Sequence, residues 1–323
     1  MSGIWTMGEM LVEIMRPKVG IPLDEAGPLL GPYPSGAPAI FIDTVARLGH
    51  PAGIIGAVGD DDFGRCLTDR LRMDGVDCRS VQVDPDGSTA VAFVTYFADG
   101  SRRFLYHINE TPAARADLTD PDRIKEPAYF HVMGCSLMTK PDFAARIVRV
   151  MQNMAAQGAR VSFDPNIRPE LLRGRDIREI VDPVLALCSV LLPGTEELLL
   201  ISGEPDVESA VQKLFENPIL DVIALKQGSR GSTIYTRENR FQIGVFPVEP
   251  IDPTGAGDCF DAGFVCGLLE GLPLETCARM ASAAASLNTA AFGPMSGDIS
   301  RERLEQVMHT QMTHEMKGKM THE

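Results

Sequence analysis

The segment Ile251-Asp252-Pro253-Thr254-Gly255-Ala256-Gly257-Asp258-Cys259-Phe260 combines residue types and spacings that suit phosphoryl transfer. Glycines let the backbone turn sharply and approach a ligand closely. The first amides of a following helix have no partners within that helix, and with the helix dipole they form a site for an anion such as a phosphoryl group. An aspartate in the same turn, Asp258, can take the proton from an attacking hydroxyl. A simpler interpretation stays open, in which Asp258 is only the N-cap of the next helix.

This segment differs from two common phosphate-binding motifs. The sequence contains no GxxxxGK[ST] loop, and Gly255 and Gly257 lack the third glycine of GxGxxG. No glycine fingerprint of that kind follows the first predicted strand either, which argues against a dinucleotide-dependent oxidoreductase.

The elements that must position Asp258 alternate along the chain. Strands are expected at 53–58, 129–133, 160–163, 190–192 and 222–226, and helices at 37–48, 63–73, 142–156 and 176–187. Further helices are expected at 259–270, 273–291 and 300–311, the second rich in alanine and serine and therefore suited to close packing. Such alternation predicts an α/β fold with a mostly parallel sheet, covered by helices on both faces, that binds ligands at the carboxyl ends of its strands.

One stretch departs from this alternation. Thr89–Ala98 and Ser101–Ile108 are strand-like and flank Asp99-Gly100, which is a strong hairpin signal. No helix separates the two strands, so the hairpin belongs to something other than the main sheet. A small β flap over the site is expected, and a meander at the sheet edge is the alternative.

The bulk properties exclude several classes of protein. The chain has 323 residues, 44% of them hydrophobic, and a formal net charge of -14. An acidic surface repels nucleic acid and anionic membranes, so neither is expected as a partner. Seven cysteines without a CxxC pair suggest reduced thiols. No signal peptide and no apolar run near the ~20 residues of a membrane span are visible, so we expect a cytoplasmic protein.

Three ordered motifs resemble the ribokinase-like, or PfkB, family of sugar kinases. Residues 252–263 are similar to its D-[ST]-T-G-A-G-D-x-F signature, with Pro253 the unusual position. The segments 35–49 and 56–64 are similar to its GGAPANVA…ARLG and G-x-V-G-D-D-x-F-G elements. The pattern is most similar to the branch of 2-keto-3-deoxygluconate and ketohexose kinases.

The resemblance implies a ribokinase-like three-layer α/β/α fold with a mostly parallel sheet and a small β-sheet lid. The lid would come from segments at about 12–34 and 89–108 of a single kinase domain, residues 1–311. The polar residues 312–323 are expected to form a disordered tail.

The resemblance also implies roles for individual residues. Asp258 would be the catalytic base, in an anion hole formed by the amides of Gly255, Ala256 and Gly257. ATP would be bound by Lys226, Gly228, Gly231, Gly255, Gly257 and Asn288. A monovalent cation such as K⁺ would be held by Asp252, Thr254, Ala291 and Gly293, and Mg²⁺ would be supported through water by Glu197. A turn-capping Asp252 and a solvated Lys226 are the alternatives, and Gly194 replaces the asparagine of the family's N-x-x-E element.

The substrate-binding residues implied by the resemblance are Glu13, Gly36, Ala37, Tyr106, Asn166, Arg168 and Asp258. Asn166 and Arg168 belong to a D-x-N-x-R-P segment similar to that of 2-keto-3-deoxygluconate kinases. They would face the sugar or the transferred phosphate, unless Arg168 pairs with a neighbouring carboxylate. Ile40 replaces an asparagine that binds sugar hydroxyls. His107 would either reach the sugar from the flap or pack at the edge of the flap.

Ile108 replaces the arginine that binds the substrate carboxylate in 2-keto-3-deoxygluconate kinases. This favours a neutral ketohexose such as tagatose or fructose, phosphorylated by ATP on a primary hydroxyl. 2-Keto-3-deoxygluconate kinase is the alternative, and a catalytically inactive sugar-binding protein is a remote one. An exposed edge of the hairpin also suggests a homodimer formed through the lid.

Overall fold

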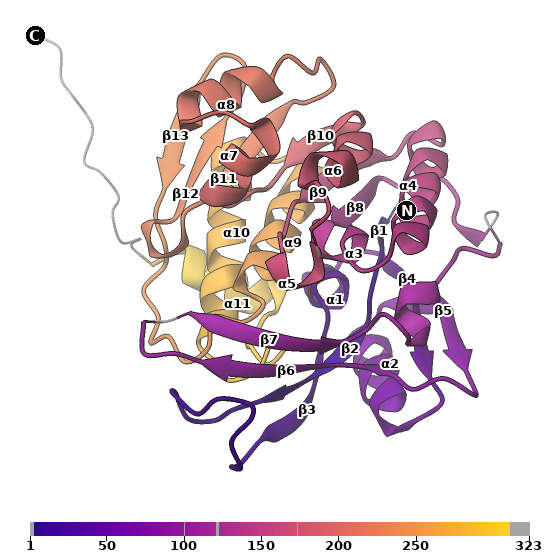
Figure 1. Ribbon diagram of the computed structural model, residues 1–323. Helices are drawn as coiled ribbons and strands as arrows, with labels where there is room; N and C mark the ends of the chain where they lie inside the picture. Colours follow the sequence, from indigo (N-terminus) through magenta and orange to yellow (C-terminus); the bar gives the residue numbers. More distant parts are fainter. Residues whose placement is uncertain (1–2, 100, 121–122, 173, 311–323) are drawn as a thin grey trace, which may run out of the picture.

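The computed structural model describes residues 3–99, 101–120, 123–172 and 174–310 (Figure 1). The strands are β1 Ile4–Met7, β2 Leu11–Met15, β3 Leu30–Ser35, β4 Ala52–Gly59, β5 Asp77–Asp84, β6 Ala90–Tyr96, β7 Arg102–His107, β8 Tyr129–Met133, β9 Arg160–Asp164, β10 Cys188–Leu191, β11 Val222–Lys226, β12 Ser232–Tyr235 and β13 Arg240–Ile243. The helices are α1 Ala37–Arg47, α2 Asp62–Met73, α3 Gly134–Leu137, α4 Pro141–Ala156, α5 Pro169–Leu172, α6 Ile177–Leu185, α7 Thr195–Ser202, α8 Val207–Leu214, α9 Ala256–Leu269, α10 Leu274–Thr289 and α11 Arg301–Met308, with short 3₁₀ turns at Pro112–Arg115 and Gly228–Arg230.

The large sheet has nine strands in the order β13-β12-β11-β10-β9-β8-β1-β4-β5. Its strands from β11 to β5 in that order run parallel, and β12 and β13 are antiparallel additions at one edge. Every residue of β4 and β8 is buried. Continuously buried strands are typical of a parallel sheet covered on both faces.

Alternate residues of the strands pack against different helices. In β11, Val222 and Ala224 belong to the apolar cluster that includes α1, α9 and α10, whereas Ile223 and Leu225 belong to the cluster that includes α4, α6 and α7. The sheet therefore lies between two helical layers, as Figure 1 shows. This confirms the predicted α/β/α architecture.

Helices α9 and α10 approach each other closely, as their small residues predict. A Cβ atom at Gly263 would lie 2.8 Å from the Cα atom of Ala281. The absence of a side chain at Gly263 allows this approach, which holds α9 closely against α10.

A separate small sheet has the strand order β3-β2-β6-β7. Strands β6 and β7 pair antiparallel, with Tyr96 opposite Arg102, which confirms the hairpin predicted around Asp99. Strand β2 joins β6 in parallel, so the hairpin belongs to the small sheet and is not a meander at the edge of the large one. Figure 1 shows this sheet beside the layered body, opposite the ends of α1 and α9.

Among the described residues, no helix combines the length and the apolar character needed to span a bilayer. All seven cysteines lie in the described segments, and each is a free thiol. The tail predicted at 312–323 lies outside the described residues.

Candidate active site

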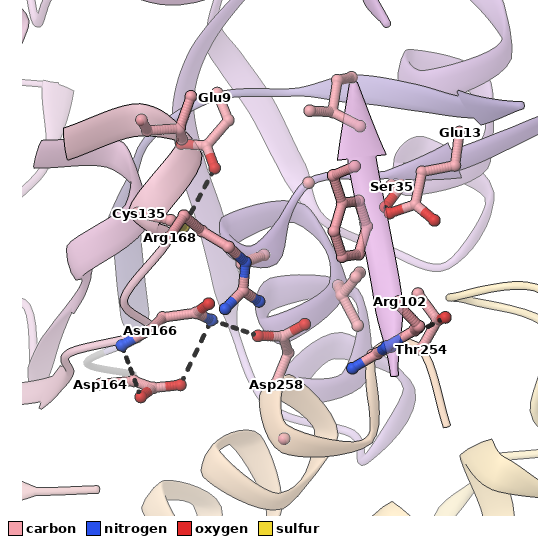
Figure 2. Close-up of a pocket in the computed structure, with 18 of the residues that line it drawn as sticks. Glu9, Glu13, Ser35, Arg102, Cys135, Asp164, Asn166, Arg168, Thr254 and Asp258 are labelled. Atoms are coloured by element: carbon pink, nitrogen blue, oxygen red, sulfur yellow. Dashed lines mark hydrogen bonds between the residues drawn. The ribbon is translucent and has the colours of Figure 1, made fainter. Parts of the chain in front are cut away.

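A polar cavity of about 200 Å³ lies at the carboxyl ends of β1, β9 and β11, between the first turn of α9 and strand β7 (Figure 2). All residues expected to bind the substrate line it: Glu13, Gly36, Ala37, Tyr106, Asn166, Arg168 and Asp258. Ile40 also lines it and adds an apolar surface. The cavity thus brings together residues that are as far apart as position 13 and position 258.

A second cavity of about 530 Å³ lies on the other side of the turn before α9. Gly228 and Gly231 line it, and most of the remaining wall is apolar, including Phe246, Phe260 and Ala285. Lys226, Pro253 and Gly257 line both cavities. The polar and the apolar cavity therefore meet at the glycine turn, and Asp258 lines only the polar one.

The glycine turn starts α9 earlier than predicted. The helix begins at Ala256, whereas the sequence suggested Cys259, because Gly255 takes a φ of 81° and serves as the N-cap. A Cβ atom at Gly255 would lie 2.5 Å from the carbonyl oxygen of Pro294, so this position needs glycine for both reasons. Asp258 lies inside the first turn and makes no capping hydrogen bond, so the N-cap interpretation is wrong.

The Asp258 carboxylate lies where a proton acceptor would be useful. Its side chain is buried, and its Oδ1 accepts a hydrogen bond of 3.1 Å from Nδ2 of Asn166. Burial, and then the nearby Asp164 carboxylate, raise the pKa of Asp258 to about 7, although Lys226 and Arg168 act in the opposite direction. The group therefore exchanges protons near neutral pH, as a general base should.

Lys226 is paired with carboxylates, so the solvated-lysine interpretation is wrong. Its Nζ lies 2.7 Å from Oδ2 of Asp164 and 3.1 Å from Oδ1 of Asp261. The carboxylates are buried and the lysine side chain is 17% exposed, at the junction of the two cavities.

Arg168 makes no ion pair with a carboxylate in the part of the chain that the structure describes. Its Nη1 donates to the carbonyl of Ile167 at 3.2 Å, and the guanidinium lies 5.9 Å from the ring centroid of Phe104. Figure 2 shows this guanidinium pointing into the cavity toward Asp258. The carboxylate-paired alternative for Arg168 is therefore not what the geometry shows.

Asp252 caps its own turn, as the alternative interpretation held. Its Oδ1 accepts from the amide of Thr254 and its Oδ2 from the amide of Gly293, both at 3.0 Å. Nδ2 of Asn288 donates to the Thr254 carbonyl at 2.7 Å, and the amide of Ala291 donates to the Asn288 carbonyl at 3.3 Å.

The same loops offer oxygen donors that suit a monovalent cation. Oδ1 of Asn288 is buried and has no hydrogen-bond partner in the part of the chain that the structure describes. The carboxylate and carbonyl oxygens around Asp252 are hard ligands. Within the described segments, no group of three His, Cys, Asp or Glu residues could hold a metal ion. A cation here would be held by the Asp252 carboxylate together with backbone and amide oxygens.

Glu197 lines the polar cavity through a carboxylate that the backbone holds. Its Oε1 accepts from the amide of Ile167 and its Oε2 from the amide of Gly194, both at 2.7 Å. It therefore ties the loop after β9 to the start of α7, and its predicted support of Mg²⁺ stays a prediction.

Several cavity residues were missed from the sequence. Arg102 and Phe104 line the cavity beside Tyr106 because alternate residues of a strand share a face, so the period of two along β7 could have found them. Glu9, after β1, accepts hydrogen bonds from the Sγ of Cys135 at 3.2 Å and from Ser136. No motif marked Glu9 or Cys135 in advance.

The structure decides two expectations about the end of β7, and for His107 it confirms the edge-packed alternative. His107 is exposed and contacts Phe93 edge to face, with ring centroids 6.0 Å apart, and it is not part of the cavity wall. Ile108 is buried in an apolar cluster with Ala113 and Ala114 and does not line the cavity either. The identity of residue 108 therefore says little about the charge of the substrate.

Comparisons with known proteins agree with this geometry. Residues 7–300 match the family model described as "pfkB family carbohydrate kinase". "Probable fructokinase-7" of Arabidopsis thaliana is 34% identical over 273 residues, which cover 83% of this chain and 79% of that protein.

Two solved structures are similar over most of their length. An Escherichia coli protein described as a "putative Ribokinase II", in complex with ATP and Mg²⁺, is 37% identical, with a TM-score of 0.87 over 95% of this chain and 99% of that one. Fructokinase from Vibrio cholerae, in its form with fructose, ADP and calcium, is 25% identical, with a TM-score of 0.82 over 95% and 99%.

Proposed function

The chain belongs to the pfkB family of carbohydrate kinases, and we propose that it transfers the γ-phosphoryl group of ATP to a primary hydroxyl of a neutral ketohexose. Fructose is favoured over tagatose because the relatives include a plant fructokinase and a bacterial fructokinase solved with fructose and ADP.

The junction of the two cavities carries this proposal. The apolar cavity suits a nucleotide base, and the polar cavity suits a sugar. Gly257 lines both, and Asp258 lines the polar one. A γ-phosphoryl group at the first turn of α9 would meet the backbone amides of Gly255, Ala256 and Gly257 on one side and the sugar hydroxyl on the other.

Asp258 would act as the base for that hydroxyl. With a pKa of about 7, it is substantially ionised at neutral pH and can take the proton as the oxygen attacks the phosphorus. Arg168 would face the developing charge on the transferred group, because it has no carboxylate partner among the described residues.

The nucleotide and its ions would be held by residues around this junction. Lys226, Gly228 and Gly231, which line the apolar cavity, are the proposed nucleotide contacts. Asn288, expected as a further contact, is buried and lines neither cavity, so we propose that it instead holds the turn through the Thr254 carbonyl. Glu197 would hold water around Mg²⁺, whose chemistry is to neutralise charge on the phosphate oxygens. Asp252, Thr254, Ala291 and Gly293 would hold a monovalent cation that orders the turn.

Buried carboxyl groups favour a neutral sugar. Glu13 lines the cavity, and its Oε1 accepts from Ser35 at 2.7 Å. Its Oε2 is buried and has no hydrogen-bond partner within the described segments. Glu9 lies at the opposite end of the cavity, as Figure 2 shows. Carboxyl oxygens at both ends of the cavity can accept hydrogen bonds from sugar hydroxyls. They would repel the carboxylate of an acid sugar.

An acid sugar such as 2-keto-3-deoxygluconate is the second candidate. Arg102 joins Arg168 in the cavity, and neither forms an ion pair with a carboxylate in the described part of the chain. Two such guanidinium groups could bind a carboxylate. The two guanidinium groups therefore favour an acid sugar as the second candidate, whatever residue stands at position 108.

A coupled assay of ADP formation decides between these substrates. We expect fructose to give the highest kcat/KM among fructose, tagatose, ribose, 2-keto-3-deoxygluconate and a nucleoside. Preference for the acid sugar would establish the second candidate, and stoichiometric nucleotide and sugar binding without turnover of any of these sugars would indicate an inactive sugar-binding protein.

The proposal also covers the oligomeric state and the cellular location of the enzyme. We propose a homodimer through the small sheet, whose edge strands are β3 and β7 and whose Leu30 is 41% exposed. Analytical ultracentrifugation would test the dimer.

A cytoplasmic location is proposed because every cysteine is a free thiol.

A further inference from the structure

Asn166 has a backbone conformation that few residues adopt. It follows β9 and Pro165, with a φ of 38°. Positive φ is uncommon outside glycine, and asparagine is among the residues that tolerate it. The side chain is buried, so this strained turn aims an amide into the site.

Both hydrogens of the Asn166 amide are committed to carboxylates. Nδ2 lies 3.1 Å from Oδ1 of Asp258 and 3.4 Å from Oδ2 of Asp164 (Figure 2). Because both neighbours accept hydrogen bonds, the NH₂ group must be the one that faces them. The amide oxygen is buried and has no hydrogen-bond partner among the described residues. Asn166 therefore has no donor left for the sugar.

The second acceptor, Asp164, is itself held firmly. Its Oδ1 accepts from the backbone amide of Asn166 at 3.1 Å, and Lys226 Nζ lies 2.7 Å from its Oδ2. Lys226 also lies 3.1 Å from both carboxylate oxygens of Asp261.

These contacts close a ring that starts and ends on α9. Asp261 follows Asp258 by one turn of the helix, and the path between their carboxylates runs through Lys226 on β11, Asp164 on β9 and Asn166. Asp261 lines neither cavity. The ring thus joins three elements behind the reacting side of Asp258.

We propose that Asn166 is a positioning residue that holds Oδ1 of Asp258 and leaves Oδ2 to receive the proton of the sugar hydroxyl. Oδ2 of Asp258 makes no hydrogen bond to the described residues, and the carboxylate lines the polar cavity. An amide donor also favours the ionised base next to the like charge of Asp164. This assignment rests on the proposed kinase function, and it replaces the expected sugar contact of Asn166.

Asn166→Gly tests the assignment because glycine adopts the same φ without strain and removes only the amide. We expect kcat to fall about 10- to 100-fold, as small misplacements of a catalytic group do, while KM for the sugar stays within about twofold. A direct sugar contact would instead raise KM and leave kcat largely unchanged, which would overturn the proposal.

A double-mutant comparison separates positioning from general destabilisation. In an Asp258→Asn background, Asn166→Gly should have no further effect on kcat, because the group that it positions is gone. A second, multiplicative loss would contradict action through Asp258. Glu126→Gly is the matched control, because Glu126 is exposed and also has a positive φ, of 48°. It should leave both kinetic constants at wild-type values.

A crystal structure of Asn166→Gly decides the point without an activity assay, so it separates this proposal from the proposed function. We expect the Asp258 carboxylate to occupy more than one orientation. A single orientation identical to that of the wild type would overturn the positioning role even if the natural substrate were not a ketohexose.

Discussion

The guanidinium of Arg102 donates a hydrogen bond of 3.0 Å to the hydroxyl of Thr254, which joins the small sheet to the turn before α9. Tyr96, opposite Arg102 in the hairpin, reaches the same turn through a hydrogen bond of 3.2 Å from its hydroxyl to Oδ1 of Asp252. The strand that covers the polar cavity is therefore tied to the loop that would hold the phosphoryl group.

Arg102→Gln should weaken sugar binding. The variant removes a charged donor that lines the cavity and contacts the turn, and a hydrogen bond to a charged group contributes roughly 1.5–3 kcal/mol. We expect KM for fructose to rise at least about tenfold, with KM for ATP less affected. Steady-state kinetics with each substrate varied in turn would measure this.

Arg103→Gln is the matched control because Arg103 is exposed, on the opposite face of the same strand. It should retain wild-type kinetics. Equal kinetic constants for the two variants would contradict a role of Arg102 in the site.

The pH dependence of the rate should report the Asp258 carboxylate. Burial raises its pKa to about 7, and only the ionised form can accept a proton. Turnover should therefore rise with pH through about 7 and level off above it, with a roughly tenfold fall per unit well below. A kcat profile that is flat between about pH 5.5 and 8, in protein shown to stay folded, would be inconsistent with this base.

Ala285→Leu should impair nucleotide binding selectively. Ala285 lines the larger, apolar cavity and not the polar one. Extra methylene groups in a fitted site cost roughly 1–3 kcal/mol, so KM for ATP should rise about tenfold. KM for fructose should not change at saturating ATP. A selective increase in KM for fructose would reverse the assignment of the two cavities.

His131 should make the protein sensitive to acid. It is buried, with Nδ1 2.9 Å from Oγ of Ser162 and its ring stacked 3.8 Å from that of Phe41. Burial lowers its pKa to about 3. As the pH falls below about 6.5, the unfolded chain binds a proton that the folded protein excludes, so stability is lost in that direction, by about 1 kcal/mol at pH 5.5.

His131→Gln removes the imidazole and with it this source of acid sensitivity. Urea unfolding at pH 8 and pH 5.5 should show a difference in unfolding free energy that is smaller in the variant than in the wild type by about 1 kcal/mol. The same pH dependence in both proteins would show that His131 is not a source of acid sensitivity.

Local patterns predicted the architecture well. The continuous apolar run at Val222–Lys226 gave the bounds of β11, and Asp99-Gly100 gave the hairpin. Both signals act between neighbours in sequence. The start of α9 was missed by three residues, from Cys259 to Ala256, because the left-handed Gly255 lets the helix begin within the glycine turn itself.

The contents of the site were less predictable because they depend on contacts between distant segments. The family motifs placed Asn166 and Lys226 in the site, but the sequence did not show that Asp164 and Asp258 use both hydrogens of the Asn166 amide. The pairing of Lys226 with Asp261 likewise needs β11 and α9 to be packed first. The prediction that residue 108 faces the substrate was wrong, because its position after β7 puts Ile108 in the apolar cluster of the small sheet.

The rate of ADP formation by Asp258→Asn with fructose tests the central claim most directly. The variant keeps the shape of the side chain and removes its ability to accept the hydroxyl proton. We predict a fall in kcat of about 10²- to 10⁴-fold, with ATP affinity by calorimetry within about threefold of the wild type. Turnover of fructose at a rate close to that of the wild type would contradict the account of Asp258 as the base.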